Sequence, residues 1–66
     1  MRVLLNGESR EIGETLTVAE LLATLDLGSG RMALECNGAI VPRSEYGRRR
    51  IADGDVIEII HAVGGG

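Results

Sequence analysis

The run from Val56 to Val63 is apolar at nearly every position, and it limits the possible folds more than any other part of this chain. A strand with one solvent-exposed face usually alternates apolar and polar residues, whereas a strand that is covered by neighbours has a nearly continuous apolar run. We therefore expect a strand over residues 56–61 that lies inside a sheet. Earlier segments of the sequence offer its neighbours.

Two Asn-Gly pairs predict the hairpins that supply those neighbours, because Asn-Gly readily adopts the two positive φ angles of a type I′ turn. The first pair, Asn6-Gly7, joins predicted strands over residues 2–6 and 8–13. The second pair, Asn37-Gly38, joins predicted strands over residues 32–36 and 39–41.

Pro42 ends the second hairpin, because proline has no N–H for a ladder hydrogen bond. We expect a polar connection over residues 43–50. Its run Arg48-Arg49-Arg50 is either a solvated loop face or a contact with an acidic partner surface.

The tetrapeptide Thr17-Val18-Ala19-Glu20 predicts the start of a helix. It reads as a capping box, in which the hydroxyl and the carboxylate each satisfy an amide that the first turn leaves unpaired. The apolar positions that follow share one helix face: Val18, Leu21, Leu22 and Leu25. We expect about two and a half turns, with Gly28 as the stop.

The predicted order is strand, strand, helix, strand, strand, strand, and one helix can cover only one face of such a sheet. With the last strand beside the first, the sheet is mixed. The expected fold class is α+β, a β-grasp (ubiquitin-like) sheet of four to five strands. Glu58 fixes the phase of the alternation, which turns Val3, Leu5, Ile57 and Ile59 toward the helix.

The open face of the sheet then carries apolar side chains. We expect a partner-docking patch made of Leu4, Val56, Ile60 and Val63. An exposed apolar patch of this kind often marks an interaction site.

Length and composition argue against several classes of function. Sixty-six residues make one domain that buries only about 60% of its unfolded surface, which leaves little room for an internal active site. Tyr46 is the only aromatic residue and the net charge is −3, which argues against nucleic acid as a partner. With Cys36 as the only cysteine, no disulfide or thiolate metal site is expected. Without a signal or membrane-length apolar run, we expect a cytoplasmic location and no membrane partner.

Other side chains have plain structural interpretations. Cys36 is interpreted as a small core residue, and His61 as a surface residue that helps docking. Asp53 and Asp55 flank Gly54, which indicates a turn and not a metal site.

After Val63 the sequence consists of Gly64, Gly65 and Gly66. Glycine has no Cβ, so such a backbone can thread a channel that is too narrow for side chains. We expect a folded domain over residues 1–63 and a flexible reactive tail over residues 64–66. The group that the tail offers is the α-carboxylate of Gly66, which an outside enzyme can activate.

Several motifs follow one another in a specific order. They are Asn6-Gly7, Thr17-Val18-x-x-Leu21-Leu22-x-x-Leu25, Asn37-Gly38-x-Ile40-Val41-Pro42-Arg43, Gly54-Asp55-x-Ile57-Glu58-Ile59 and Val63-Gly64-Gly65-Gly66. Each is weak alone, but together they resemble the ThiS family, the sulfur carriers of thiamine biosynthesis. The resemblance spans the whole chain.

The resemblance implies a cycle at Gly66. A ThiF-like adenylyltransferase would use ATP and Mg to convert the carboxylate to an acyl adenylate. A persulfide sulfur donor would replace AMP and leave a thiocarboxylate, and a ThiG-like thiazole synthase would accept the sulfur for the thiazole ring. The chain itself would bind no cofactor and no metal and would not be an enzyme, since its role is to position the tail.

Three other interpretations stay open. A molybdopterin synthase small subunit has the same fold and tail but is usually longer and more aromatic. A ubiquitin-like modifier would be found attached to the lysines of other proteins; this chain has only arginine among its seven basic residues, so it cannot be conjugated to itself through a side-chain amide. A β-grasp binding module would keep its function without Gly65 and Gly66.

Overall fold

The computed structural model describes residues 1–25 and 32–61 of the chain. The elements are β1 (Arg2–Leu5), β2 (Glu8–Glu11), α1 (Val18–Thr24), β3 (Met32–Cys36), β4 (Ala39–Val41), the 3₁₀ helix η1 (Arg43–Glu45) and β5 (Val56–His61). The predicted order of strands and helix is confirmed, and η1 is an addition within the predicted connection. The described part has no helix long and apolar enough to span a membrane.

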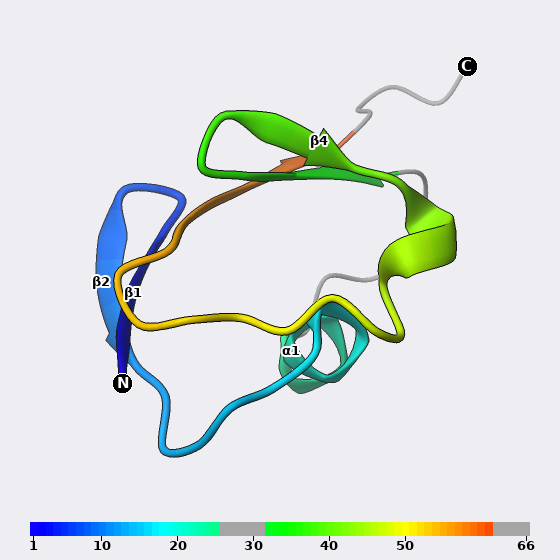
Figure 1. The fold of residues 1–66 in the computed structure, drawn as a ribbon. Helices are drawn as coiled ribbons and strands as arrows, with labels where there is room; N and C mark the ends of the chain where they lie inside the picture. Colours follow the sequence, from blue (N-terminus) through cyan, green and yellow to red (C-terminus); the bar gives the residue numbers. More distant parts are fainter. Residues whose placement is uncertain (26–31, 62–66) are drawn as a thin grey trace.

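The five strands form one mixed sheet in the order β2-β1-β5-β3-β4. The last strand lies between β1, to which it is parallel, and β3, to which it is antiparallel. In Figure 1 the helix lies on one side of the sheet, and no described element covers the other side. The predicted β-grasp arrangement, with the last strand inside the sheet, is confirmed.

Both Asn-Gly pairs form the predicted turns. Asn6 and Gly7 have φ angles of 50° and 83°, and Asn37 and Gly38 have φ angles of 54° and 86°. Positive φ at both central residues is what a type I′ turn requires. The strands of the first hairpin are one or two residues shorter than predicted, whereas those of the second hairpin have the predicted bounds.

The capping box at the start of α1 is confirmed. The Thr17 hydroxyl accepts a hydrogen bond from the Glu20 N–H at 3.1 Å, and the Glu20 carboxylate accepts one from the Thr17 N–H at 2.9 Å. The Thr17 N–H and the Thr17 hydroxyl both donate to the Glu20 carboxylate, and these two bonds lower the pKa of Glu20. The reciprocal pair fixes where the helix begins.

The helix is shorter than predicted, and its end is a correction. It has seven residues, and Leu25 is a cap with extended backbone (φ −100°, ψ 138°) and not part of the helical stripe. The Thr24 hydroxyl donates to the Leu21 carbonyl at 2.7 Å, which satisfies one of the carbonyl groups that the helix end leaves open. The predicted stop at Gly28 lies outside the described residues.

The core lies between α1 and the inner face of the sheet. The most fully buried large side chains are Leu34, Ile51, Ile57 and Val18, each at most 2% exposed. Burying one such side chain stabilises the fold by about 1.5–3 kcal/mol. Ile51 belongs to the segment between η1 and β5. The Ile51 N–H donates to the Leu16 carbonyl at 2.8 Å. This segment therefore closes the core beside the helix.

Cys36 is buried in this core, as its structural interpretation predicts. Burial raises the pKa of its thiol, and the negative charge of Asp55 raises it further. The thiol is therefore protonated and enclosed at neutral pH, and we assign it no chemical role.

Candidate docking face and the strand that leads to the tail

The open face of the sheet carries exposed apolar side chains where the sequence predicts them. Leu4, Val56 and Ile60 are 40%, 42% and 48% exposed. Leu4 is the register partner of Val56 on adjacent strands, and Ile60 lies opposite Ala33 of β3. At the alternate positions of β5, Ile57 and Ile59 point the other way; Ile57 is buried and Ile59 is half-buried. The predicted phase of the alternation is confirmed.

Ile40 of β4 belongs to the same face and was missed in the sequence prediction. It is 61% exposed and lies opposite Glu35, which is in turn opposite Glu58. The two-residue turn at Asn37-Gly38 pairs Cys36 with Ala39 and therefore Glu35 with Ile40. The position of Ile40 on this face could thus have been predicted from the turn. We define the docking face as the exposed apolar side chains of the open sheet face: Leu4, Val56, Ile60 and Ile40.

Two carboxylates, those of Glu35 and Glu58, lie directly opposite each other within the docking face. Like charges at such a cross-strand position destabilise a sheet slightly. A basic side chain of a partner would remove that repulsion, so the face suits an apolar partner surface that also carries a positive charge.

Two asparagine side chains hold β5 in place on either side of the docking face. Asn37 Oδ1 accepts a hydrogen bond from the Val56 N–H at 2.9 Å, at the start of the strand. Asn6 Oδ1 accepts one from the Ile59 N–H at 2.8 Å, beyond the last residue of β1. The asparagines of the two turns therefore hold β5 at both ends: Asn37 at its start and Asn6 toward its end.

His61 is the last residue of β5; it is exposed and lies opposite Met32. The predicted tail residues Gly64, Gly65 and Gly66 lie outside the described residues, as does Val63 of the predicted patch. The division into a domain of residues 1–63 and a tail of residues 64–66 stays a prediction.

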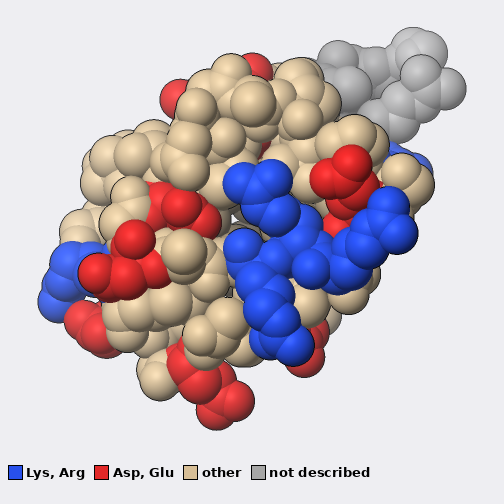
Figure 2. Space-filling view, in the orientation of Figure 1, with Lys and Arg blue, Asp and Glu red and all other residues tan. Residues whose placement is uncertain are grey.

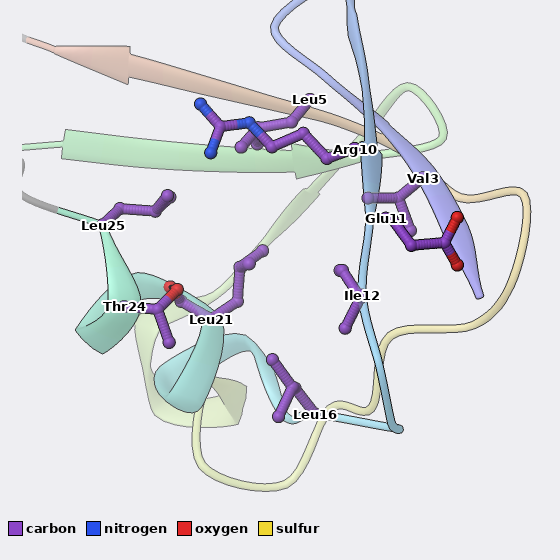
Figure 3. Close-up of a pocket in the computed structure, with 9 residues that line it drawn as sticks. All are labelled: Val3, Leu5, Arg10, Glu11, Ile12, Leu16, Leu21, Thr24 and Leu25. Atoms are coloured by element: carbon purple, nitrogen blue, oxygen red, sulfur yellow. Dashed lines mark hydrogen bonds between the residues drawn. The ribbon is translucent and has the colours of Figure 1, made fainter.

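A small hollow of about 230 Å³ lies on the opposite side of the sheet from the docking face, between α1 and the first hairpin (Figure 3). Most of its lining is apolar, including Val3, Leu5 and Leu21, while Arg10 and Glu11 belong to the edge strand β2. Its volume is below the roughly 300–1,000 Å³ typical of ligand pockets, and few polar groups converge on it. We assign this hollow to the packing of the core.

No group of three His, Cys, Asp or Glu side chains within residues 1–25 and 32–61 is arranged to hold a metal ion. The predicted turn at Asp53, Gly54 and Asp55 is present, and Gly54 has a φ of 87°. The Asp55 carboxylate accepts hydrogen bonds from the Ala52 N–H and the Asn37 side chain, so it closes a turn.

Within residues 1–25 and 32–61, one α-helix packs on one face of a five-stranded mixed sheet whose last strand is central, and this arrangement defines a ubiquitin-like domain of the β-grasp class. The profile of the ThiS family matches residues 3–66, and the chain belongs to this family.

Named relatives agree with this assignment. The sulfur carrier protein ThiS of Escherichia coli is 35% identical over 66 residues, which is the full length of both chains. The crystal structure of the thiamine biosynthesis protein ThiS from Geobacter metallireducens superposes with a TM-score of 0.86 at 30% identity, again over the whole of both chains. The thiazole synthase of Paramagnetospirillum magneticum is 41% identical over 66 residues, and this chain spans 20% of its length.

Proposed function

We propose that this chain is a sulfur carrier for the formation of the thiazole ring of thiamine, with the sulfur bound at Gly66. The observation that carries the proposal is the match to the Escherichia coli sulfur carrier over the full length of both chains. The central strand β5 ends at His61, and in the sequence Ala62 and Val63 lead from it to Gly64, Gly65 and Gly66. A rigid strand followed by glycine suits a group that must reach into the site of another protein.

The proposed chemistry takes place in the sites of partner enzymes. A carboxylate has no usable leaving group, so an adenylyltransferase first joins the Gly66 carboxylate to AMP from Mg-ATP and releases pyrophosphate. The terminal sulfur of a partner's cysteine persulfide then attacks the acyl carbon, and AMP leaves. Reductive cleavage of the resulting acyl disulfide by a thiol yields the thiocarboxylate of Gly66.

The third partner is a thiazole synthase that takes the sulfur and returns the carboxylate. The similarity of this chain to one fifth of a thiazole synthase supports that partner. An enzyme of this type that carries a carrier-like segment in its own chain keeps sulfur donor and acceptor site at high effective concentration. A separate carrier must obtain the same proximity by docking.

The contribution of this chain is therefore positional and not enzymatic. The docking face binds the partner, and β5, held by Asn6 and Asn37, directs the glycine tail into the partner's site. Gly64 and Gly65 allow the tail to pass through a narrow channel, because they carry no Cβ.

Removing Gly65 and Gly66 tests this function. We expect the shortened protein to fold with unchanged stability and to lose all support of thiazole formation in a reconstituted reaction with the adenylyltransferase, a sulfur donor and the thiazole synthase. Retained activity would contradict the carrier function and would favour a β-grasp binding module. Sulfur transfer to a molybdopterin precursor by the full chain would favour the molybdopterin pathway instead.

A further inference from the structure

Four of the seven arginines of this chain lie in one short segment, residues 43–50. This arginine segment contains four arginines and one glutamate, which is a formal charge of +3. Since the whole chain has a net charge of −3, the other residues together carry −6. All four arginines are exposed: Arg43, Arg48, Arg49 and Arg50. In Figure 2 basic side chains gather in the centre and right of the view, with most acidic side chains around them.

The backbone of the arginine segment is held firmly against the start of α1. The Arg49 carbonyl accepts a hydrogen bond from the Val18 N–H at 2.9 Å, and the Tyr46 carbonyl accepts one from the Ala19 N–H at 2.8 Å. Within the segment, the Arg48 and Arg49 N–H groups both donate to the Glu45 carbonyl, at 3.0 and 2.8 Å. The arginines therefore project from a fixed scaffold, which lowers the entropic cost of using them in binding.

Little in the described part of the chain neutralises this charge. The ion pairs among residues 1–25 and 32–61 join Glu11 to the N-terminus and to Arg2, and none involves the arginine segment. Glu20, the acidic residue of α1, interacts electrostatically with Arg50. Its carboxylate, however, already accepts hydrogen bonds from the Thr17 N–H and hydroxyl. Arg49 lies close enough to Asp55 to interact with it, whereas the guanidinium groups of Arg43, Arg48 and Arg50 are available to an outside carboxylate.

The arginine segment begins at the end of the sheet where β5 ends. Val41, the last residue of β4, lies opposite Leu34, which lies opposite Ile59 of β5. Arg43 and His61 each follow two residues later, and β4 and β5 run in the same direction because both are antiparallel to β3. Figure 1 shows η1 at the side toward which both strands point. A protein that binds at this end of the sheet is therefore close to the start of the arginine segment.

We propose that the arginine segment binds an acidic surface on the adenylating enzyme, next to the entrance through which that enzyme receives the tail. The segment lies beside α1, on the opposite side of the sheet from the docking face. The two surfaces therefore do not overlap, and a partner bound at one leaves the other accessible. This inference rests on the proposed function and adds to it the charge of the partner's surface.

A local acidic patch on a protein fits this arrangement better than nucleic acid does. Nucleic acid carries a continuous row of phosphates that would extend past eight residues onto the rest of the chain, where the formal charge is −6. A protein surface can be acidic at the arginine segment and neutral or basic elsewhere. Complementary charge of this kind mainly raises the association rate and fixes the orientation of docking.

The test measures association rates of the full chain with the adenylyltransferase over a series of salt concentrations. The variants are Arg48→Gln, Arg50→Gln and the double variant, with Arg10→Gln of β2 as the matched control for loss of one charge elsewhere. Arg48→Lys keeps the charge. Arg49 is left unchanged because it also interacts electrostatically with Asp55. Adenylate formation is recorded in parallel for each variant, and thermal unfolding checks that each one folds.

We expect each single Gln variant to associate about threefold more slowly at low salt, and the double variant about tenfold more slowly, with a smaller salt dependence. Arg48→Lys and Arg10→Gln should match the wild type. Equal slowing by Arg10→Gln and Arg48→Gln, no slowing by either, or no binding of the wild type would overturn the proposal. So would tighter binding of a single-stranded oligonucleotide than of the enzyme through the same arginines.

The two proposals fail in different ways in this experiment. If the wild type and every arginine variant associate at the same rate and all are adenylated, the inference about the arginine segment is wrong and the carrier function stands. If the wild type binds through the arginines but forms no adenylate, the carrier function is wrong and the acidic partner surface stands.

Discussion

The side-chain oxygen of Asn6 accepts a hydrogen bond from the backbone N–H of Ile59 at 2.8 Å, across 53 positions of the sequence. The Asn6 N–H also donates to the Ile57 carbonyl at 2.9 Å. One turn residue therefore continues the pairing of β5 after β1 has ended at Leu5. This contact holds the part of β5 that leads toward the glycine residues.

Substitutions of Asn6 test this contact. We expect Asn6→Gly to lower the free energy of unfolding by about 1 kcal/mol, because the Ile59 N–H loses its partner while glycine keeps the positive φ. Asn6→Ala should cost about 1 kcal/mol more, because alanine also disfavours that φ. Asn6→Asp keeps an acceptor oxygen and serves as the control. Urea unfolding measures all three, and a Gly variant as stable as the wild type would contradict the assignment.

The docking face predicts the effect of a buried charge at Ile60. We expect Ile60→Asp to weaken the complex with the adenylyltransferase about tenfold or more, since the new carboxylate would lose its hydration in the interface. The free protein should remain folded, because Ile60 is 48% exposed. Ala23→Asp adds the same charge on the exposed side of α1 and should bind as the wild type does. Calorimetric titration gives both affinities, and equal affinity of the two variants would exclude this face.

The turn before β5 predicts a dependence of stability on pH. Partial burial disfavours the charged form of Asp55, but hydrogen bonds from the Ala52 N–H and the Asn37 side chain outweigh burial and lower its pKa. A carboxylate with a lowered folded-state pKa adds stability above its ordinary pKa of about 3.9, and this stability is lost as the pH falls through the lower folded value.

We therefore expect the loss of stability in Asp55→Asn to be largest near neutral pH and to shrink below about pH 4. Unfolding in urea at several pH values measures the difference from the wild type. A difference that stays the same down to the acid limit of folding would show that the charge of Asp55 does not contribute.

The glycine residues after Val63 predict a graded response to side-chain size. Gly65→Ala should slow adenylation moderately and Gly65→Val should nearly abolish it, because a Cβ and its branches obstruct a channel shaped for bare backbone. Neither change should alter thermal unfolding. The readout is pyrophosphate release with the adenylyltransferase in excess, and normal turnover of the Val variant would exclude threading.

The parts of the fold that were predicted correctly depend on local chemistry. The two Asn-Gly turns need positive φ angles, and the capping box needs only Thr17 and Glu20, so neighbouring residues determine them. The alternation around Glu58 fixed which side chains of β5 are exposed, because a shift of one residue would bury that carboxylate.

The parts that were missed depend on contacts between distant segments. The segment over residues 43–50 was predicted as a polar connection, yet its carbonyl groups accept hydrogen bonds from the first turn of α1 and lead to the buried Ile51. The helix ends at Thr24, whose hydroxyl donates to the Leu21 carbonyl, and Leu25 has extended backbone. Neither arrangement has a local sequence pattern that marks it.

The most direct test of the carrier function is tandem mass spectrometry of the last peptide after incubation with the adenylyltransferase, Mg-ATP and a sulfur donor. The mass of the whole chain is not sufficient, because exchange of oxygen for sulfur alters it almost as much as oxidation of Met1 or Met32 does, so fragment ions of the last peptide must locate the change. We predict that sulfur is found at Gly66 and only when ATP is present. A Gly66 that remains a plain carboxylate in an adenylyltransferase reaction that modifies a ThiS control would contradict the account.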